Sequence, residues 1–158
     1  MHFLLTNDDG IDAPGLLALY HAIESPHRVS VVAPAREQSA CSHGVTLWSD
    51  LAVRQFEHEV MGPVFTADGK PADCVRLAIA KLVDDPIDCV VSGINRGANA
   101  SIIDVACSGT VAGAREGAFC GLRAISVSQF FRDDQPVDWP MATRIVRGLL
   151  GQLLDAGR

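Results

Sequence analysis

The sequence predicts an α/β fold: a three-layer α/β/α, Rossmann-like sandwich around a mostly parallel sheet. Short apolar runs alternate along the chain with stretches in which apolar residues recur at helical spacing, and this alternation is typical of strand–helix units. A length of 158 residues predicts one domain that is large enough to bury a core. With 48% hydrophobic and 20% charged residues, the composition is that of a globular protein rather than a disordered one.

The expected helices and strands follow from the spacing of apolar residues and from the turn residues at their ends. Pro14 is tolerated in a first helical turn, because the N–H group that proline lacks would be unpaired there anyway. Residues 51–56 and 60–66 alternate poorly, so we expect an antiparallel or edge excursion there. In chain order, the expected elements are a strand at 2–6, a helix at 14–23, a strand at 29–33, the two weaker strands, a helix at 71–83, a strand at 87–91, a small polar loop up to 108, a helix at 110–119, a strand at 124–127 and an amphipathic helix over 141–154. The expected apolar face of the helix at 71–83 consists of Val75, Ala78, Ile79 and Leu82.

The composition also excludes several classes of protein. With 13 basic and 19 acidic residues, the formal net charge is −6, so the chain lacks the basic surface of a protein that binds nucleic-acid duplexes. No apolar run approaches the roughly 20 residues that cross a membrane, and we expect no membrane partner. The first residues show no secretion signal, and the five cysteines contain no CxxC pair, so we expect a cytoplasmic protein with reduced thiols.

Polar sequences follow three of the expected strands and predict one binding site. They are Asn7-Asp8-Asp9-Gly10, the loop at 35–44, and Ser92-Gly93-Ile94-Asn95. In an open α/β sheet, ligands bind outside the carboxyl ends of the strands, so we expect these three segments to converge.

Asp8 and Asp9 are adjacent carboxylates directly after a buried strand. Two carboxylates this close raise each other's pKa unless a cation neutralises them, and oxygen ligands suit Mg²⁺, Mn²⁺ or Ca²⁺ rather than a soft metal. The alternative is a solvated turn, for which Asn-Asp-Asp-Gly is equally good composition. Ser39 could complete the shell of a hard metal or be a turn residue. The amides of Asn95 and Asn99 could bind a metal or phosphate oxygen, or cap a turn.

Ser108, Gly109 and Thr110 precede an expected helix. Backbone N–H groups at a helix N-terminus, together with two hydroxyls, form a natural phosphate site, and the alternative is a simple N-cap by Ser108 or Thr110. There is no GK[ST] motif and no GxGxxG after the first strand, so neither ATP-driven chemistry nor a dinucleotide cofactor is indicated. His43 is the one histidine near the expected site, and we interpret it as a loop residue.

Taken together and in this order, these segments resemble the SurE family, the stationary-phase survival proteins, which are metal-dependent 5′/3′-nucleotidases. The resemblance covers nearly the whole chain up to about Ser128. It rests on Asn7-Asp8-Asp9-Gly10 with Ala13-Pro14-Gly15, on Val32-Ala33-Pro34 followed by Ser39, on Gly69-Lys70-Pro71-Ala72-Asp73-Cys74-Val75, on Ser92-Gly93-Ile94-Asn95-Arg96-Gly97-Ala98-Asn99, and on Ser108-Gly109-Thr110-Val111 with Glu116-Gly117. Two departures lie close together: Cys107 replaces the family's Tyr, and residues 100–106 replace a loop rich in Gly and Asp.

The resemblance implies how the site residues divide their roles. A divalent metal would be held by Asp8, Asp9, Ser39 and Asn95, and the substrate phosphate would be bound by Ser108, Gly109 and Thr110 with the amides of Asn95 and Asn99. A hard cation polarises a phosphoryl oxygen and activates a water for in-line attack. Asp8 or Asp9 would be the catalytic group that takes the proton of that water. An aspartyl-phosphate route is not indicated, because the DxD spacing of such enzymes is missing.

The resemblance therefore implies a phosphomonoesterase that hydrolyses nucleoside 5′- or 3′-monophosphates with Mg²⁺ or Mn²⁺. The alternative is a catalytically weak module that binds metal and nucleotide, or an inactive fragment of such an enzyme. Members of the family normally continue past the last helix and associate as dimers or tetramers. We therefore expect residues 1–158 to form a single domain that lacks the usual C-terminal strands and oligomerisation arms, and the full-length form to be a homo-oligomer.

Overall fold

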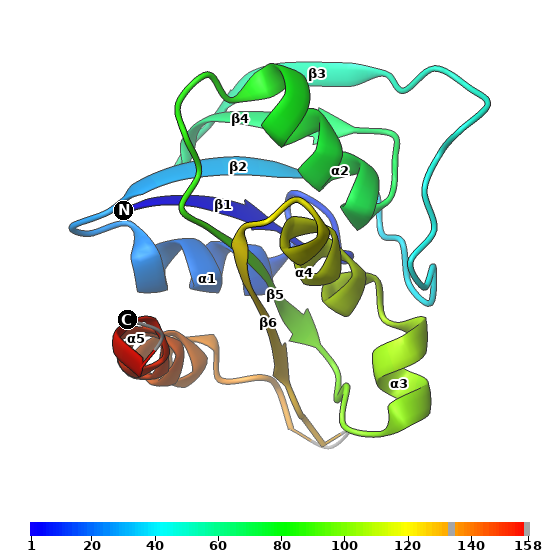
Figure 1. Ribbon diagram of the computed structural model, residues 1–158. Coiled ribbons are helices and arrows are strands. Elements are labelled where there is room, and N and C mark those ends of the chain that lie inside the picture. The colour runs from blue at the N-terminus through cyan, green and yellow to red at the C-terminus, as the bar shows by residue number, and fades with distance from the viewer. Residues whose placement is uncertain (133–134, 157–158) are drawn as a thin grey trace.

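A computed structural model describes residues 1–132 and 135–156 and shows a six-stranded sheet with the strand order β3-β4-β2-β1-β5-β6 (Figure 1). Every neighbouring pair of strands is parallel except β3 and β4, which are antiparallel at the edge. The predicted α/β class with a mostly parallel sheet is confirmed, and so is the predicted antiparallel excursion. The elements are β1 (His2–Thr6), α1 (Pro14–Ile23), β2 (Arg28–Pro34), β3 (Val53–His58), β4 (Gly62–Ala67), α2 (Pro71–Leu77), a π-helical turn (Ala78–Leu82), β5 (Cys89–Arg96), α3 (Ile102–Cys107), α4 (Gly109–Phe119), β6 (Arg123–Gln129) and α5 (Trp139–Ala156).

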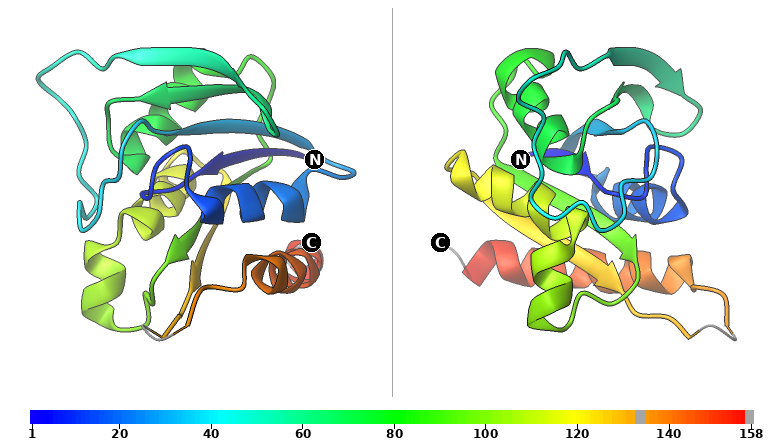
Figure 2. Two further views of the ribbon diagram at one scale, coloured as in Figure 1. Left: turned by 180° about the vertical axis from the view of Figure 1, so that it is seen from behind. Right: turned by 90° about the vertical axis from the view of Figure 1, so that its right-hand side faces the viewer.

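Helices cover both faces of the sheet and give it three layers (Figure 1, Figure 2). Because side chains alternate along a strand, β1 directs Phe3 and Leu5 to one face and Leu4 to the other. The first face packs against α1 and α5 and forms the larger of two apolar cores. The second packs against α2, whose Cys74 and Val75 are fully buried. Burial on both faces explains why β1 is apolar from Phe3 to Leu5 without alternation.

Three elements differ from the expectations: the helix expected at 71–83, the strand expected at 87–91, and the segment that forms α3. The expected helix at 71–83 is α-helical only to Leu77 and then widens into the π-helical turn, and Ile79, expected on the buried face, is exposed. The strand expected at 87–91 continues to Arg96, with an irregularity between Ser92 and Asn95, because β6 pairs with it on both sides of that point. Gly93 supplies the conformation required there, with φ of 139°, which side chains rarely adopt.

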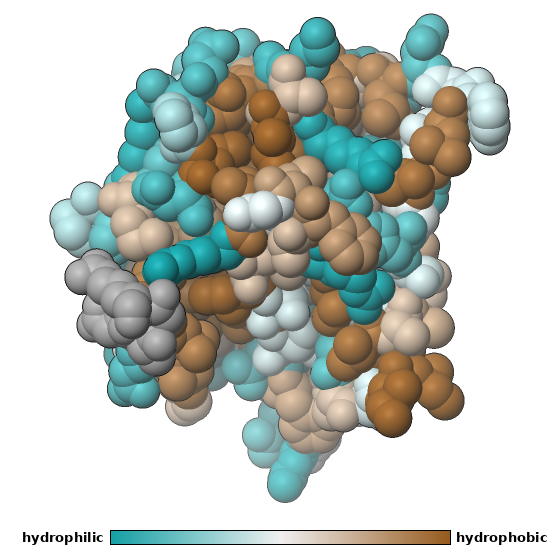
Figure 3. Space-filling model, in the orientation of Figure 1, coloured by the Kyte–Doolittle hydropathy of each residue, from teal (hydrophilic) through white to brown (hydrophobic). Residues whose placement is uncertain are grey.

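Helix α3 lies where only a polar loop was expected. It has no buried residue, so it lacks the periodic apolar face by which helices are found in a sequence. Its start is instead defined by a reciprocal cap: Ser101 Oγ accepts from the Asp104 N–H, and Asp104 Oδ2 accepts from the Ser101 N–H, each at 3.1 Å. Figure 3 shows hydrophobic side chains over α3 at the lower right, where Ile102 and Ile103 are exposed.

The remaining expectations concern membrane-spanning helices, the cysteines and the number of domains. Among residues 1–132 and 135–156, no helix has the length and apolar character needed to cross a membrane. Cys74 and Cys89 are buried in the cores, and Cys41, Cys107 and Cys120 are free thiols closer to the surface. The expectation of a single domain over 1–158 stays a prediction, and residues 133–134 and 157–158 lie outside the described part of the chain.

Candidate active site

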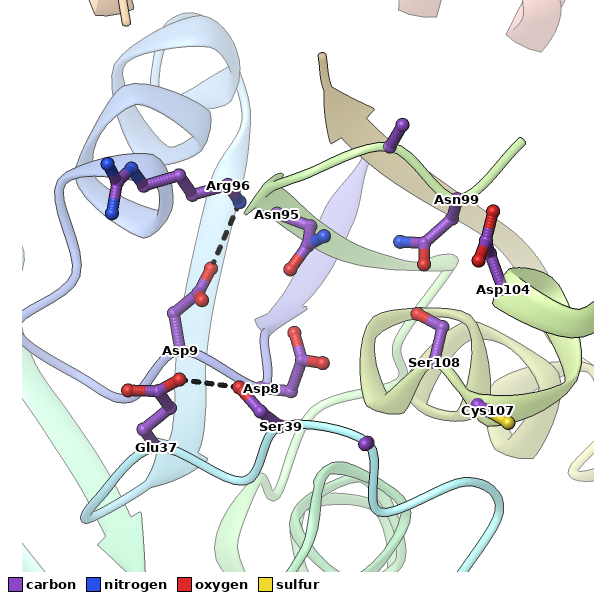
Figure 4. A pocket seen from close by; sticks show the side chains of 12 residues that line it. Asp8, Asp9, Glu37, Ser39, Asn95, Arg96, Asn99, Asp104, Cys107 and Ser108 are labelled. Carbon is purple, nitrogen blue, oxygen red and sulfur yellow. Dashed lines mark hydrogen bonds between the residues drawn. The ribbon is translucent and has the colours of Figure 1, made fainter. Parts of the chain in front are cut away.

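A polar cavity of about 350 Å³ lies at the carboxyl edge of the sheet, where ligands bind in open α/β folds (Figure 4). The three polar segments predicted to converge do converge there: the turn after β1, the loop after β2 and the end of β5 all contribute side chains. The lining residues are Asp8, Asp9, Glu37, Ser39, Ala40, Asn95, Arg96, Ala98, Asn99, Asp104, Cys107 and Ser108. Of the residues proposed from sequence, Gly109 and Thr110 are therefore adjacent to the cavity rather than part of its wall.

Asp8 and Asp9 leave β1 through a turn that is fixed by Asn7, whose Nδ2 donates to the carbonyl oxygen of Gly10 at 2.8 Å. The carboxylate of Asp8 is buried and accepts a short hydrogen bond from the Thr110 hydroxyl. Asp9 is half-buried, and its Oδ2 accepts from the Arg96 N–H at 3.3 Å. The turn thus directs two neighbouring carboxylates into one cavity, which a straight strand could not do.

The surroundings of Asp8 and Asp9 disfavour the ionised form of both carboxyl groups. Burial raises the pKa of Asp8, although hydrogen bonds from the Thr110 side chain and from backbone N–H groups of Thr110 and Gly109 lower it in part. Burial also raises the pKa of Asp9, and the charges of Asp8 and Glu37 raise it further. A cation placed between these groups would relieve both effects.

Ser39 reaches the cavity because the loop after β2 folds back against the end of β1. The N–H of Gln38 donates to the carbonyl oxygen of Asp8 at 2.7 Å, which fixes the neighbouring residues at the cavity mouth. Figure 4 shows the hydroxyl of Ser39 beside the carboxylate of Asp8 and hydrogen-bonded to Glu37.

Asn95 and Asn99 lie on the opposite side of the cavity, at and beyond the end of β5. The Nδ2 of Asn95 donates to the Gly97 carbonyl oxygen at 3.2 Å, and Figure 4 shows its Oδ1 directed toward Asp8. The Nδ2 of Asn99 donates to Ser128 Oγ at 2.7 Å. In each residue one of the two amide N–H groups is therefore used within the protein, and the oxygen and the second N–H remain for a ligand.

The N-terminus of α4 is closely joined to Asp8. Ser108 is the N-cap, and its Oγ accepts from the Val111 N–H at 3.1 Å, so the simple capping role considered for it is observed. Thr110 is fully buried, and its hydroxyl donates a hydrogen bond to Asp8 Oδ1. Phosphate binding by this helix end stays a prediction. The structure adds that Thr110 and the backbone N–H groups of Gly109 and Thr110 hydrogen-bond the carboxylate of Asp8.

Several residues of the site were not singled out from the sequence. Glu37, Arg96 and Asp104 line the cavity, and the only signal for them was their position inside segments that were already noted as polar. His43 lies in a loop, as interpreted, and the structure adds that its Nε2 lies 2.7 Å from Glu116 Oε2 and that its ring stacks on Phe119. No local pattern could have paired side chains 73 positions apart.

The donor set suits a hard divalent cation. All the predicted ligands present oxygen: two carboxylates, the Ser39 hydroxyl and the Asn95 amide. Within residues 1–132 and 135–156, no three His, Cys, Asp or Glu side chains come together as a metal-binding group. A metal here would therefore depend on the neutral oxygens of Ser39 and Asn95 to complete the shell that Asp8 and Asp9 begin.

The fold and the cavity define the class of protein: a Rossmann-like α/β protein with an oxygen-lined ligand site at the carboxyl edge of its sheet. Comparison with known families assigns it more closely. The family model described as "Survival protein SurE" matches residues 3–157, and the chain belongs to this family.

Individual relatives agree with that assignment. The chain is 45% identical over 155 residues to a protein of Rhodopirellula baltica, and 47% identical over 157 residues to one of Desulfatibacillum aliphaticivorans, both named "5'-nucleotidase SurE". These matches cover 98% and 99% of this chain. The crystal structure of a SurE protein from Aquifex aeolicus superimposes with a TM-score of 0.85 at 36% identity, covering 98% of this chain and 60% of that one. The chain also spans only 60% and 61% of the length of the two curated relatives.

Proposed function

We propose that this chain is a divalent-metal-dependent phosphomonoesterase that hydrolyses nucleoside 5′- or 3′-monophosphates to a nucleoside and phosphate. The observation that carries the proposal is the convergence of Asp8 and Asp9, both with raised pKa values, on a cavity shared with Ser39 and Asn95. The names of the relatives support this reading, and they favour it over a module that only binds metal and nucleotide.

The chain's own residues divide the work of such a reaction. Asp8, Asp9, Ser39 and Asn95 would hold Mg²⁺ or Mn²⁺, and Ca²⁺ fits the same donors. When bound, the metal neutralises the two carboxylates and supplies the positive charge that a phosphoryl group needs. Asn99 and Ser108 lie across the cavity from Asp9, where they would orient phosphate oxygens with Gly109 and Thr110 behind them.

Proton transfer falls to the aspartate pair. A water oxygen attacks phosphorus, the bond from phosphorus to the nucleoside oxygen breaks, one proton must leave the water, and the departing nucleoside oxygen must gain one. Both carboxyl groups have a raised pKa, but Asp8 is buried and accepts a hydrogen bond from Thr110, whereas Asp9 is the more exposed of the two, so Asp9 is better placed to accept the proton.

The remaining parts of the proposal concern the setting of the enzyme. The substrate is a small nucleotide, not a nucleic-acid duplex, and the protein acts in the cytoplasm. The full-length form is a homo-oligomer, a dimer or tetramer.

Phosphate release from a panel of 5′- and 3′-nucleoside monophosphates tests the function directly. With Mg²⁺ or Mn²⁺ present we expect turnover that EDTA abolishes. Asp9→Ala should reduce kcat by at least about 100-fold, because it removes a ligand and the proton acceptor together.

Glu59→Ala is the matched control, since it removes an equal charge from an exposed turn outside the cavity. Metal-independent turnover, or an Asp9→Ala variant as active as the wild type, would overturn the proposal. Tight nucleotide binding without phosphate release would favour the binding module instead.

A further inference from the structure

Glu37 reaches into the cavity from the same loop as Ser39, and nothing in the predicted metal site includes it. Gln38, the residue between them, is fixed by its N–H bond to the Asp8 carbonyl oxygen at 2.7 Å. Because the middle residue is fixed, Glu37 and Ser39 are presented to the cavity together, and Figure 4 shows their side chains meeting beside Asp8.

The contact between these two side chains determines where the Ser39 proton lies. Ser39 Oγ donates to Glu37 Oε1 at 2.5 Å. A hydroxyl has one proton and two lone pairs, so it can bind a cation only when the proton points away from the cation. An ionised carboxylate is the strongest acceptor for that proton, and it leaves the lone pairs of the hydroxyl free for the cavity.

We infer that Glu37 is a positioning residue of the metal site, which holds the Ser39 hydroxyl in the orientation that presents its lone pairs to a divalent cation. The inference rests on the proposed metal-dependent function. It assigns Glu37 an effect through Ser39 and not a place among the ligands themselves.

Glu37 also acts through its negative charge, and suitable substitutions separate this effect from its hydrogen bond to Ser39. Its charge contributes to the raised pKa of Asp9, after burial and the charge of Asp8. If Glu37 acted mainly through its charge or by direct coordination, glutamine would be as damaging as alanine. If it acts as a hydrogen-bond acceptor, glutamine retains the function, because its Oε1 can still accept from Ser39.

Calorimetric titration of the metal-free protein with Mn²⁺ alone separates these cases without measuring activity. We expect Glu37→Ala to raise the Kd for Mn²⁺ about 10-fold or more, as is typical for groups that orient metal ligands. Glu37→Gln should stay within about threefold of the wild type. In a Ser39→Ala background, Glu37→Ala should change the Kd by less than about twofold, because the hydroxyl that it orients is gone.

Glu59→Ala again controls for the loss of one negative charge, and it should leave the Mn²⁺ affinity unchanged. Three results would overturn the inference alone: a Glu37→Ala variant that binds Mn²⁺ like the wild type, a Glu37→Gln variant as weak as Glu37→Ala, or additive effects of Glu37→Ala and Ser39→Ala. Failure of the wild-type protein to bind Mn²⁺ would overturn both this inference and the proposed function.

Discussion

Position 109 requires a glycine because of what surrounds it at the start of α4. A Cβ atom there would lie 2.8 Å from Asp8 Cβ, 2.8 Å from Cys41 Sγ and 2.9 Å from Asp8 Oδ2. The helix end can therefore approach Asp8 closely enough to hydrogen-bond it only because the residue has no side chain. The absence of a side chain at Gly109 therefore allows the carboxylate of Asp8 to lie against the helix end.

Gly109→Ala should destabilise the protein and weaken metal binding together. The added methyl group must displace Asp8 or Cys41, and such overpacking costs about 1–3 kcal/mol. Urea unfolding measures the first effect, and Mn²⁺ titration measures the second. A variant with wild-type stability and metal affinity would contradict this expectation, because it would show that Asp8 and Cys41 can shift to accommodate the methyl group without cost.

Gly148→Ala is the matched control for this substitution. Gly148 lies inside α5, and a Cβ atom built there meets nothing within 4 Å. Since alanine is the better helix former, we expect the variant to gain about 0.5–1 kcal/mol and to bind metal normally.

At the scale of residues, the sequence predicted which side chains line the cavity better than it predicted their contacts. Asp8 and Asp9 could be predicted because adjacent carboxylates after an apolar run are visible locally. The partner of Thr110 could not, because its hydroxyl meets Asp8 across 102 positions of the chain. Glu37 was equally hidden, since its role depends on a hydrogen bond to Ser39 that exists only once the loop has folded back.

Two buried carboxylates hold the long loop between β2 and β3 in place. Asp73 in α2 accepts from the Thr46 N–H at 2.8 Å and from the Thr46 hydroxyl at 2.9 Å. Glu116 in α4 accepts from Arg76 Nε at 2.5 Å and makes its 2.7 Å contact with His43. Figure 2 shows this loop passing beside the helices that carry them. The placement of Ser39 thus depends on side chains outside its own loop.

Glu116→Gln should lower stability in a manner that depends on pH. Burial alone raises the pKa of Glu116, but hydrogen bonds from Arg76 and His43 outweigh it, and the pKa lies below its ordinary value of 4.5. A depressed carboxyl pKa stabilises the folded state above the unfolded pKa, and this contribution is lost as the pH falls through the folded pKa. We expect a loss of about 2 kcal/mol at pH 7, because one charged hydrogen bond is removed and a donor is left unpaired.

The difference between Glu116→Gln and the wild type should shrink below the ordinary pKa of glutamate, as the wild-type carboxylate takes up its proton. Urea unfolding across that range checks the sign. Glu24→Gln is the control, because Glu24 is exposed, forms a surface ion pair with His21, and should change stability by less than about 0.5 kcal/mol. A difference that grows on acidification would contradict the role given to Glu116.

At the scale of elements, the sequence predicted most of the sheet and missed what long-range pairing decides. Ser92-Gly93 was interpreted as the end of a strand, yet β5 continues because Asn95 and Arg96 pair with Ser128 and Gln129 of β6. Helix α3 was missed for the opposite reason: its signal was local but not apolar, and it lay in the capping pair Ser101 and Asp104.

At the scale of the whole molecule, α5 has two apolar faces, and the described residues cover only one of them. Ala142, Val146 and Leu150 are buried in the core beside α1, and the Thr143 hydroxyl donates to the Ala18 carbonyl oxygen at 3.1 Å. A second set of apolar residues follows at four-residue spacing on the outer side of the helix, each about half exposed: Met141, Ile145, Leu149 and Leu153. A continuous apolar stripe of this kind favours association.

We therefore expect the chain to self-associate through this stripe, with an average mass in sedimentation that rises with protein concentration. Ile145→Lys combined with Leu149→Lys should shift the protein toward monomer, because two charges would have to be buried in any contact that uses the outer face of α5. Gln152→Lys is the control on the same helix, as it adds a charge at an exposed polar position. Circular dichroism should be unchanged in all variants, since neither apolar residue contributes to the core. A wild-type chain that stays monomeric at high concentration would show that half-exposed side chains at this spacing are tolerated in water.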